Sequence, residues 1–231
     1  HSYYNKILHG FCIKFFAIFF MICIHVYEQL GRYDYKHLLP TGFFRYVIEF
    51  LGGPMAAPVF MFAMGMGMVY TRHNSSEEFI KRGWKLLFMG FALNFFRESL
   101  LEILGNIILG MDYSFDYIAG GFLNIDILHF AGMTFIIVGL MKKAKIGTGR
   151  MVVVGVLLQA AGMWASHLTL SSVIPRNLLG LLLPTGEKVA FSFALWCLYP
   201  LLGIIFAEYL QRDSSRPWNS SSCFWQSDAM G

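Results

Sequence analysis

Six long apolar stretches constrain this chain more than any other feature of its sequence. They approach or exceed the roughly 20 residues that a helix needs to cross about 30 Å of hydrocarbon. The stretches cover residues 7–30, 47–70, 86–96 with a continuation towards 109, 127–141, 151–170 and 189–210. A segment inside a bilayer must satisfy its own backbone hydrogen bonds, and helices do this internally. The sequence therefore predicts an all-α, polytopic transmembrane helical bundle of about six spans in residues 1–211, followed by a polar, disordered tail in residues 212–231.

Composition supports the membrane class and excludes several others. Hydrophobic residues make up 56% of the chain and charged residues only 14%, whereas about a quarter of an ordinary soluble domain is charged. Lys and Arg lie in short clusters between apolar runs, which argues against a nucleic-acid-binding surface. The four cysteines have no paired ligand spacing. We interpret them as small buried hydrophobic residues rather than disulfides or a metal site.

The distribution of basic residues predicts an orientation. With the N-terminus in the cytoplasm, the inside segments carry twelve of the 18 Lys and Arg residues. Short cytoplasmic loops are enriched in these residues. We therefore expect an integral membrane protein, in the cell membrane if the source is bacterial, with a cytoplasmic N-terminus.

Lys14 and His25 enclose ten uninterrupted apolar residues in the first stretch. Eleven helical steps of about 100° bring His25 within about 20° of Lys14 and roughly 16 Å further along the axis. An ionisable residue at membrane depth is a functional candidate, since it is costly to keep there. Glu28, one turn on, could orient the ring and raise its basicity. The competing interpretation is a histidine that only packs against a neighbouring helix.

Two further polar groups accompany the third and fourth stretches. Asn94 and Arg97 occupy adjacent turns, although the arginine could simply extend to the interface at a helix end. Asp126 and His129 repeat an i, i+3 arrangement, for which a helix cap is the competing interpretation. The segment between them, residues 98–124, is either an interfacial helix with an outer loop or a re-entrant segment.

Arg82 and Lys85 lie at the predicted inner start of the third stretch. Such clusters usually follow the positive-inside bias. With Lys14 they could also bind the phosphates of a donor, because lysine and arginine are ordinary phosphate ligands. Glycines and prolines at 52–58 favour a broken second span, and Gly65 and Gly67 are expected to permit close helix packing.

No standard hydrolase elbow, zinc-protease or nucleotide-loop motif is present, which leaves those activities unsupported. The order of five blocks is more informative. They read KFFAIFFMICIHVYE, GGPMAAPVFMFAMGMGMVY, IKRGWKLLFMGFALNFFR, IDILHFAGMTF and FSFALWCLYPLLGIIFAE. In this order, the chain resembles membrane acyltransferases of the acyltransferase-three superfamily, and more closely the branch that includes heparan-alpha-glucosaminide N-acetyltransferase and its bacterial relatives.

The resemblance implies a transmembrane acyltransferase domain that passes an acetyl group from acetyl-CoA to a hydroxyl or amine of a carbohydrate-type acceptor. By position, His25 matches the family's catalytic histidine and Lys14 its basic partner. Members commonly have about ten spans, against six here. We predict catalytic and substrate or donor contacts at these positions: catalytic His25, Glu28, Arg97 and His129; acetyl-CoA-binding Lys14, Arg82 and Lys85; acceptor-binding Asn94 and Asp126; and no metal.

Two alternatives remain at this stage. A transporter or permease fragment would use His25, Glu28 and Asp126 as an intramembrane path, and a truncated relative would fold without activity. The predicted partners are the lipid bilayer, acyl-CoA and the acceptor, and a homo-oligomer stays open.

Overall fold

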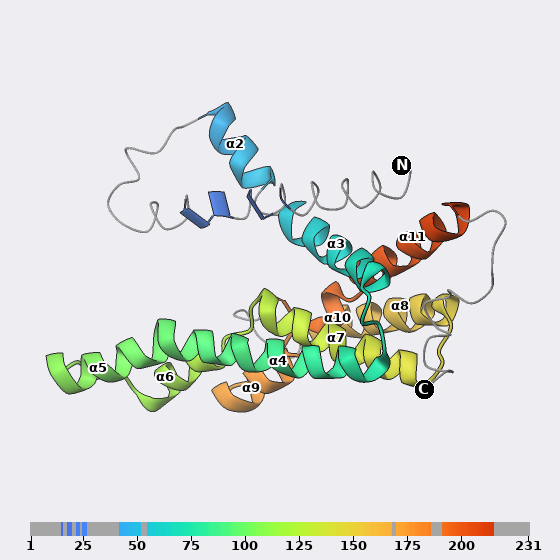
Figure 1. Cartoon of the computed structure of the whole chain (residues 1–231). Helices are drawn as coiled ribbons and strands as arrows, with labels where there is room; N and C mark the ends of the chain where they lie inside the picture. The colour runs from blue at the N-terminus through green and yellow to red at the C-terminus, as the bar shows by residue number, and fades with distance from the viewer. Residues whose placement is uncertain are drawn as a thin grey trace. The chain divides into compact units, whose positions relative to one another are not determined.

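Helices form every regular element that the computed structural model describes, so the predicted all-α class is confirmed (Figure 1). The structure describes residues 15, 18–19, 22–23, 25–26, 42–51, 55–167, 170–185 and 191–214. The chain divides into two compact units. One combines residues 1–71 with 199–220, and the other combines residues 72–198 with 221–231.

The first unit contains α2 (Phe43–Phe50), α3 (Ala56–Tyr70) and most of α11 (Leu198–Ser214). Glycines allow α3 and α11 to cross closely: a Cβ atom on Gly65 would lie 2.0 Å from the Pro200 carbonyl oxygen, and one on Gly203 would lie 2.1 Å from that of Phe62. The rings of Phe62 and Phe206 add an aromatic contact with centroids 5.6 Å apart. The packing role predicted for Gly65 is thus confirmed.

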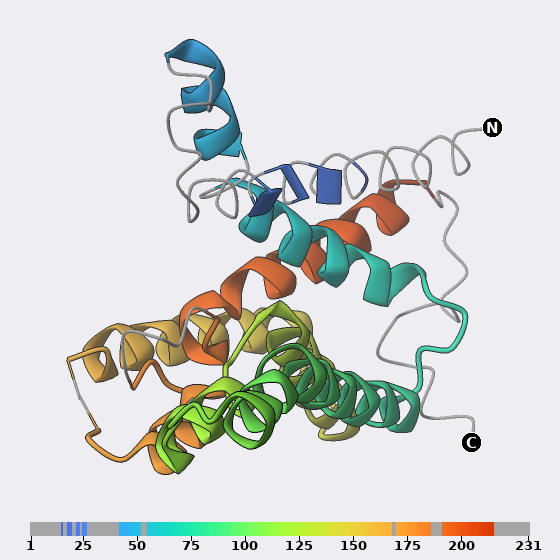
Figure 2. The same ribbon diagram turned by 90° about the vertical axis from the view of Figure 1, so that its left-hand side faces the viewer.

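The second unit is built on the antiparallel pair of α4 (Ser76–Asn94) and α7 (Ile127–Lys143), seen side by side in Figures 1 and 2. Small residues recur every seven positions along the contact, with Gly83 and Gly90 on α4 and Gly132 and Gly139 on α7. A Cβ atom on Gly83 would lie 2.6 Å from the Gly132 carbonyl oxygen, and one on Gly132 would lie 2.9 Å from that of Gly83. Such small residues let the backbones of membrane helices approach. We call these four residues the glycine seam.

α4 continues without interruption through the π-helical segment η3 (Phe95–Ser99) into α5 (Leu100–Leu109). Charged residues are frequent up to Lys85, and the apolar part begins at Leu86. Residues 86–109 extend about 36 Å at 1.5 Å per residue, enough to cross about 30 Å of hydrocarbon. The chain then turns at 110–114 and returns as α6 (Phe115–Phe122). Residues 98–124 are therefore largely a helical hairpin.

The remaining helices of the second unit are α8 (Thr148–Ala165), α9 (Val173–Gly180) and α10 (Phe193–Trp196). α8 packs on α10, since a Cβ on Gly162 would lie 2.8 Å from the Ala194 Cβ. The buried thiol of Cys197 lies 3.6 Å from the Gly155 carbonyl oxygen. α9 contacts α6 through Val173, 3.6 Å from a Cβ built on Gly120.

The predicted six spans are confirmed only in part. Among the described residues, two helical stretches are long and apolar enough to cross a membrane, Thr148–Ala165 and Phe193–Arg212. A third results if α6 and α7, which meet at a bend of 56°, form one span. The third predicted stretch is helical but carries Arg97, Glu98 and Glu102, and α3 is a shorter apolar helix. Most of the first stretch, residues 52–54 of the second and the tail from 215 lie outside the described residues.

Candidate functional site

The break between α6 and α7 brings together an acid and a buried histidine. Asp126 is the N-cap of α7, and its Oδ1 accepts a hydrogen bond from the backbone N–H of Leu128 at 3.0 Å. Nδ1 of His129 lies 2.9 Å from the same Oδ1 and 3.3 Å from the backbone nitrogen of Asp126. The two side chains form a reciprocal capping box. The cap interpretation left open by the sequence is therefore observed.

His129 is fully buried, and its second ring nitrogen faces α4. The ring meets Phe91 edge to face at a centroid distance of 4.4 Å, and a Cβ on Gly90 would lie 2.9 Å from Nε2. Nε2 has no hydrogen-bond partner among the described residues. At Nδ1 the Asp126 carboxylate can only accept a proton and the Asp126 backbone N–H can only donate one, so the two contacts favour opposite tautomers of the ring.

Asn94 connects α4 to the loop that precedes α7. The side chain is completely buried, and its Nδ2 donates to the carbonyl oxygens of Phe122, at 3.2 Å, and Asn124, at 2.7 Å. Its Oδ1 accepts from Nη2 of Arg97 at 3.4 Å. Carbonyls at a helix break have no partner within the helix, so Asn94 satisfies the backbone where α6 ends.

Arg97 lies in the π-helical segment, one turn beyond Asn94. Its Nη2 also donates to Oε1 of Glu98 at 2.8 Å, and its side chain is 51% exposed. Both described bonds use Nη2. π-helical segments are frequent at functional sites. Through Asn94, the arginine is connected to the loop that carries Asp126.

A row of polar residues at four-residue intervals follows the same helix: Asn94, Glu98, Glu102 and Asn106. We call it the polar stripe. In an α-helix this row would drift by about 120° over twelve residues at 100° per residue. The five π-helical residues turn only roughly 80° each, which reduces the drift to about 20°. The π-helical segment therefore keeps the stripe on one side of the helix.

The stripe faces α6 and the turn before it. A Cβ on Gly121 would lie 3.2 Å from Oε2 of Glu98 and 3.4 Å from Oε2 of Glu102. Asn106 donates to the Tyr113 carbonyl oxygen at 2.9 Å and accepts from the Tyr113 N–H at 2.8 Å. Glu102 and Asn106 are absent from the residues predicted above, although their interval of four in the sequence could have indicated both.

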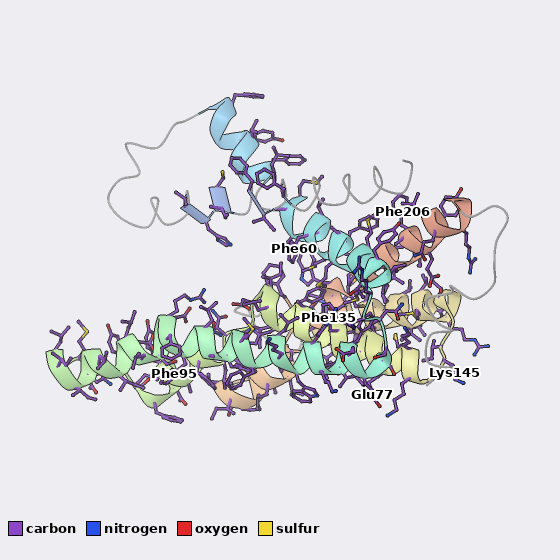
Figure 3. The ribbon with its side chains drawn as sticks, in the orientation of Figure 1. Phe60, Glu77, Phe95, Phe135, Lys145 and Phe206 are labelled. Atoms are coloured by element: carbon purple, nitrogen blue, oxygen red, sulfur yellow. The ribbon has the colours of Figure 1, made fainter. Side chains whose placement is uncertain are left out.

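The predicted donor-binding residues lie elsewhere on α4. Lys85 is exposed and Arg82 is half-buried. At 1.5 Å per residue they are about 14 and 18 Å along the axis from Asn94. Figure 3 shows this end of the α4 and α7 pair near Glu77 and Lys145, with Phe95 towards the other end. The structure thus places Arg82 and Lys85 nearer the start of α4 than Asn94 and than Gly90, on which His129 packs.

Lys142 is a buried cation that the sequence pattern does not single out. Its Nζ donates to the Asn74 carbonyl oxygen and lies 5.7 Å from the centroid of Phe79. In the sequence it belongs to a basic cluster that simply follows the positive-inside bias. Its burial depends on contact with a segment 68 residues earlier, which no local pattern reveals.

Of the candidate residues in the first apolar stretch, the structure describes only His25. His25 belongs to a helical stretch and is exposed, whereas Lys14 and Glu28 lie outside the described residues. In the described part of the chain, no group of three or more His, Cys, Asp or Glu residues could hold a metal ion. Cys23 is half-buried and Cys197 is buried, both as free thiols.

A comparison with known protein families decides the class of this protein. The family described as heparan-alpha-glucosaminide N-acetyltransferase, catalytic, matches residues 12–227, which is nearly the whole chain. The chain belongs to this family. Neither the curated proteins nor the solved structures yield a match.

Membership in the heparan-alpha-glucosaminide N-acetyltransferase family confirms the resemblance seen in the ordered sequence blocks. The family is one of membrane acetyltransferases that use acetyl-CoA. The candidate membrane helices described above agree with an integral membrane protein. The enzyme interpretation is therefore favoured over the transporter that the sequence left open.

Proposed function

We propose that this protein is an integral membrane acyltransferase that moves an acetyl group from acetyl-CoA to a hydroxyl or amine of a carbohydrate-type acceptor. The observation that carries the proposal is the family match over residues 12–227. The basic bias of the predicted inner segments supports a cytoplasmic N-terminus and donor access from the cytoplasm.

In the proposed reaction, His25 removes a proton from the acceptor hydroxyl or amine as its oxygen or nitrogen attacks the thioester carbonyl. The C–S bond then breaks, and the CoA sulfur leaves with the proton that His25 holds. A general base of this kind typically contributes about 10² to 10⁴ fold. Glu28, three residues on in the sequence, is assigned to orienting the imidazole.

Arg97 and His129 are assigned to the developing charge and to proton transfer. Two features of Arg97 support its assignment to the developing charge: its guanidinium is half exposed, and it has donors beyond those that bond Asn94 and Glu98. Such donors stabilise an oxyanion. Asn94 and Asp126 are assigned to the acceptor side. Their described bonds hold the α6 to α7 break, so they shape the acceptor site through the loop.

Lys14, Arg82 and Lys85 are assigned to the phosphates of acetyl-CoA. Arg82 and Lys85 are three residues apart and share one face of α4. The segment that starts α4 carries other charges, including Glu77 and Lys81, so it suits an aqueous boundary where a charged nucleotide can bind.

Acetyl transfer from radiolabelled acetyl-CoA to a glucosamine-type acceptor tests whether His25 is the general base. We expect purified His25→Ala protein to lose about 10² to 10⁴ fold in rate. His73→Ala is the matched control, because His73 is an exposed loop histidine of the second unit, and it should retain the parental rate. A His25→Ala rate equal to the parent would disprove the mechanism.

CoA binding to detergent-solubilised protein tests the donor site and the class. Replacing Arg82 and Lys85 by Gln should weaken binding by about tenfold or more, since a charge-assisted hydrogen bond contributes about 1.5–3 kcal/mol. Replacing the exposed Lys143 and Lys145 by Gln removes the same charge and should leave the Kd unchanged. Absence of CoA binding by the parent protein would favour the transporter.

A further inference from the structure

In the helical hairpin of α5 and α6, apolar side chains of α5 face outward and its polar side chains face α6. This is the reverse of the arrangement expected for a hairpin in water. The outward side of α5 carries Leu101, Leu104, Ile107 and Ile108, whose exposed fractions are 62, 39, 74 and 70%. We call these four residues the aliphatic face. A surface helix of a soluble protein turns such a face inward and its polar residues outward.

The polar side of the same helix is the one that contacts the rest of the hairpin. Ser99 donates to the Ile118 carbonyl oxygen at 3.2 Å, and the polar stripe contacts Gly121 and Tyr113. Oε2 of Glu102 is inaccessible to solvent. In hydrocarbon, ionisable side chains turn towards protein in this way, because exposure to lipid is costly.

We propose that the aliphatic face of α5 contacts the acyl chains of the bilayer, so that the hairpin lies within the hydrocarbon layer and shields Glu102 and Asn106 from lipid. The length of the helix agrees, because residues 86–109 extend about 36 Å and reach across the hydrocarbon only if α5 is included. The turn at 110–114 then reaches the interface, where Asp112 is exposed and Tyr113 stacks on Tyr117 at 5.3 Å. Tyrosines are enriched at this depth.

The composition of the aliphatic face favours lipid over a second copy of the chain. Helix contacts within membranes use small residues, and protein interfaces are enriched in Tyr, Trp and Arg. All four residues of the face are bulky aliphatics. Gly105, the glycine of α5, faces inward, where a Cβ would lie 3.3 Å from the Tyr113 ring. Residues 98–141 also contain no Lys or Arg, so nothing there pairs with acidic protein or anionic lipid.

Spin labels on single cysteines test the proposal in phospholipid bilayers without any activity measurement. The labels are placed by Leu104→Cys and Ile108→Cys in the 231-residue chain with its four native cysteines replaced. We expect collisions with oxygen to exceed those with a water-soluble nickel chelate several-fold at both sites. Lys145→Cys, in an exposed turn, is the control and should show the opposite ratio.

Two results would overturn the proposal. Nickel access at Leu104→Cys equal to that at Lys145→Cys would place the face in water. Low access to both reagents, with dipolar broadening between labels, would assign the face to a second copy.

A second experiment needs no substitution, in case the cysteine-free protein does not fold. Parent protein is reconstituted with a phospholipid that carries a photoactivatable diazirine in its acyl chain, and the attached label is located by mass spectrometry. We expect label within 100–109 and on α8, whose Val153 and Leu157 are exposed, and none at 143–147. Label on α8 without label on α5 would contradict the proposal.

Discussion

Replacement of glycine by alanine is expected to have opposite effects on stability at two positions. One is Gly83, in the glycine seam between α4 and α7, and the other is Gly149, in α8. In Gly83→Ala, the new Cβ would lie 2.5 Å from Cγ1 of Ile136, 2.6 Å from the carbonyl oxygen of Gly132 and 2.9 Å from the backbone nitrogen of Ile136. Two of these atoms are backbone atoms of α7. Relief of the 2.6 Å approach to ordinary contact near 3.4 Å therefore requires the helices to separate by about 0.8 Å.

The magnitude follows from two opposing contributions. Replacing a mid-helix glycine by alanine stabilises a helix by roughly 0.5–1 kcal/mol, whereas overpacking costs typically about 1–3 kcal/mol. Because backbone rather than a flexible side chain must move, we expect a cost at the upper end. The net loss in the free energy of unfolding is then about 2–2.5 kcal/mol, which lowers Tm by roughly 4–10 °C for a chain of this size.

Gly149→Ala is the matched control, because a Cβ added to Gly149 in α8 would have no atom within 4 Å. We expect Tm to stay level or rise slightly there, by up to about 0.5 kcal/mol of stability. Thermal unfolding of both variants in one detergent, followed by the loss of monodisperse protein, makes the comparison. A Gly83→Ala protein that unfolds at or above the Tm of Gly149→Ala would refute the close approach of α4 and α7.

Four further substitutions, at three positions, give separate checks. Asn94→Leu should lower the free energy of unfolding by about 2–3 kcal/mol, since two loop carbonyls lose their donor; unchanged thermal unfolding would contradict the buried amide. Asp126→Ala should cost about 0.5–2 kcal/mol through loss of the cap, whereas Asp126→Asn should retain most of that stability. If the Asn variant is stable yet transfers acetyl slowly, the carboxylate acts in the chemistry; equal rates would limit it to the cap. Gly65→Ala should destabilise the first unit more than Gly83→Ala does the second, because its Cβ would lie 2.0 Å from a carbonyl oxygen, and limited proteolysis of residues 55–70 would detect the loosening.

Asp126 and His129 illustrate how far a local pattern can be followed. Their spacing indicated an interacting pair and also a helix cap, and the structure contains the cap. The burial of His129 could not be foreseen, because it depends on Gly90 and Phe91, which are about 40 residues earlier and on another helix. Asn94 is similar: the sequence indicated a polar residue within an apolar helix, but its two carbonyl partners come from 28 and 30 residues later.

The amino-acid sequence was sufficient for the helical membrane class, the approximate helix positions and the family, because run length, hydrophobicity and block order are local or linear properties. It could not reveal which helices approach through glycine, which side of α5 faces protein, or how the π-helical segment aligns the polar stripe. Those features depend on distances of about 2 to 4 Å between residues far apart in the chain, and only the packed helices bring such residues together.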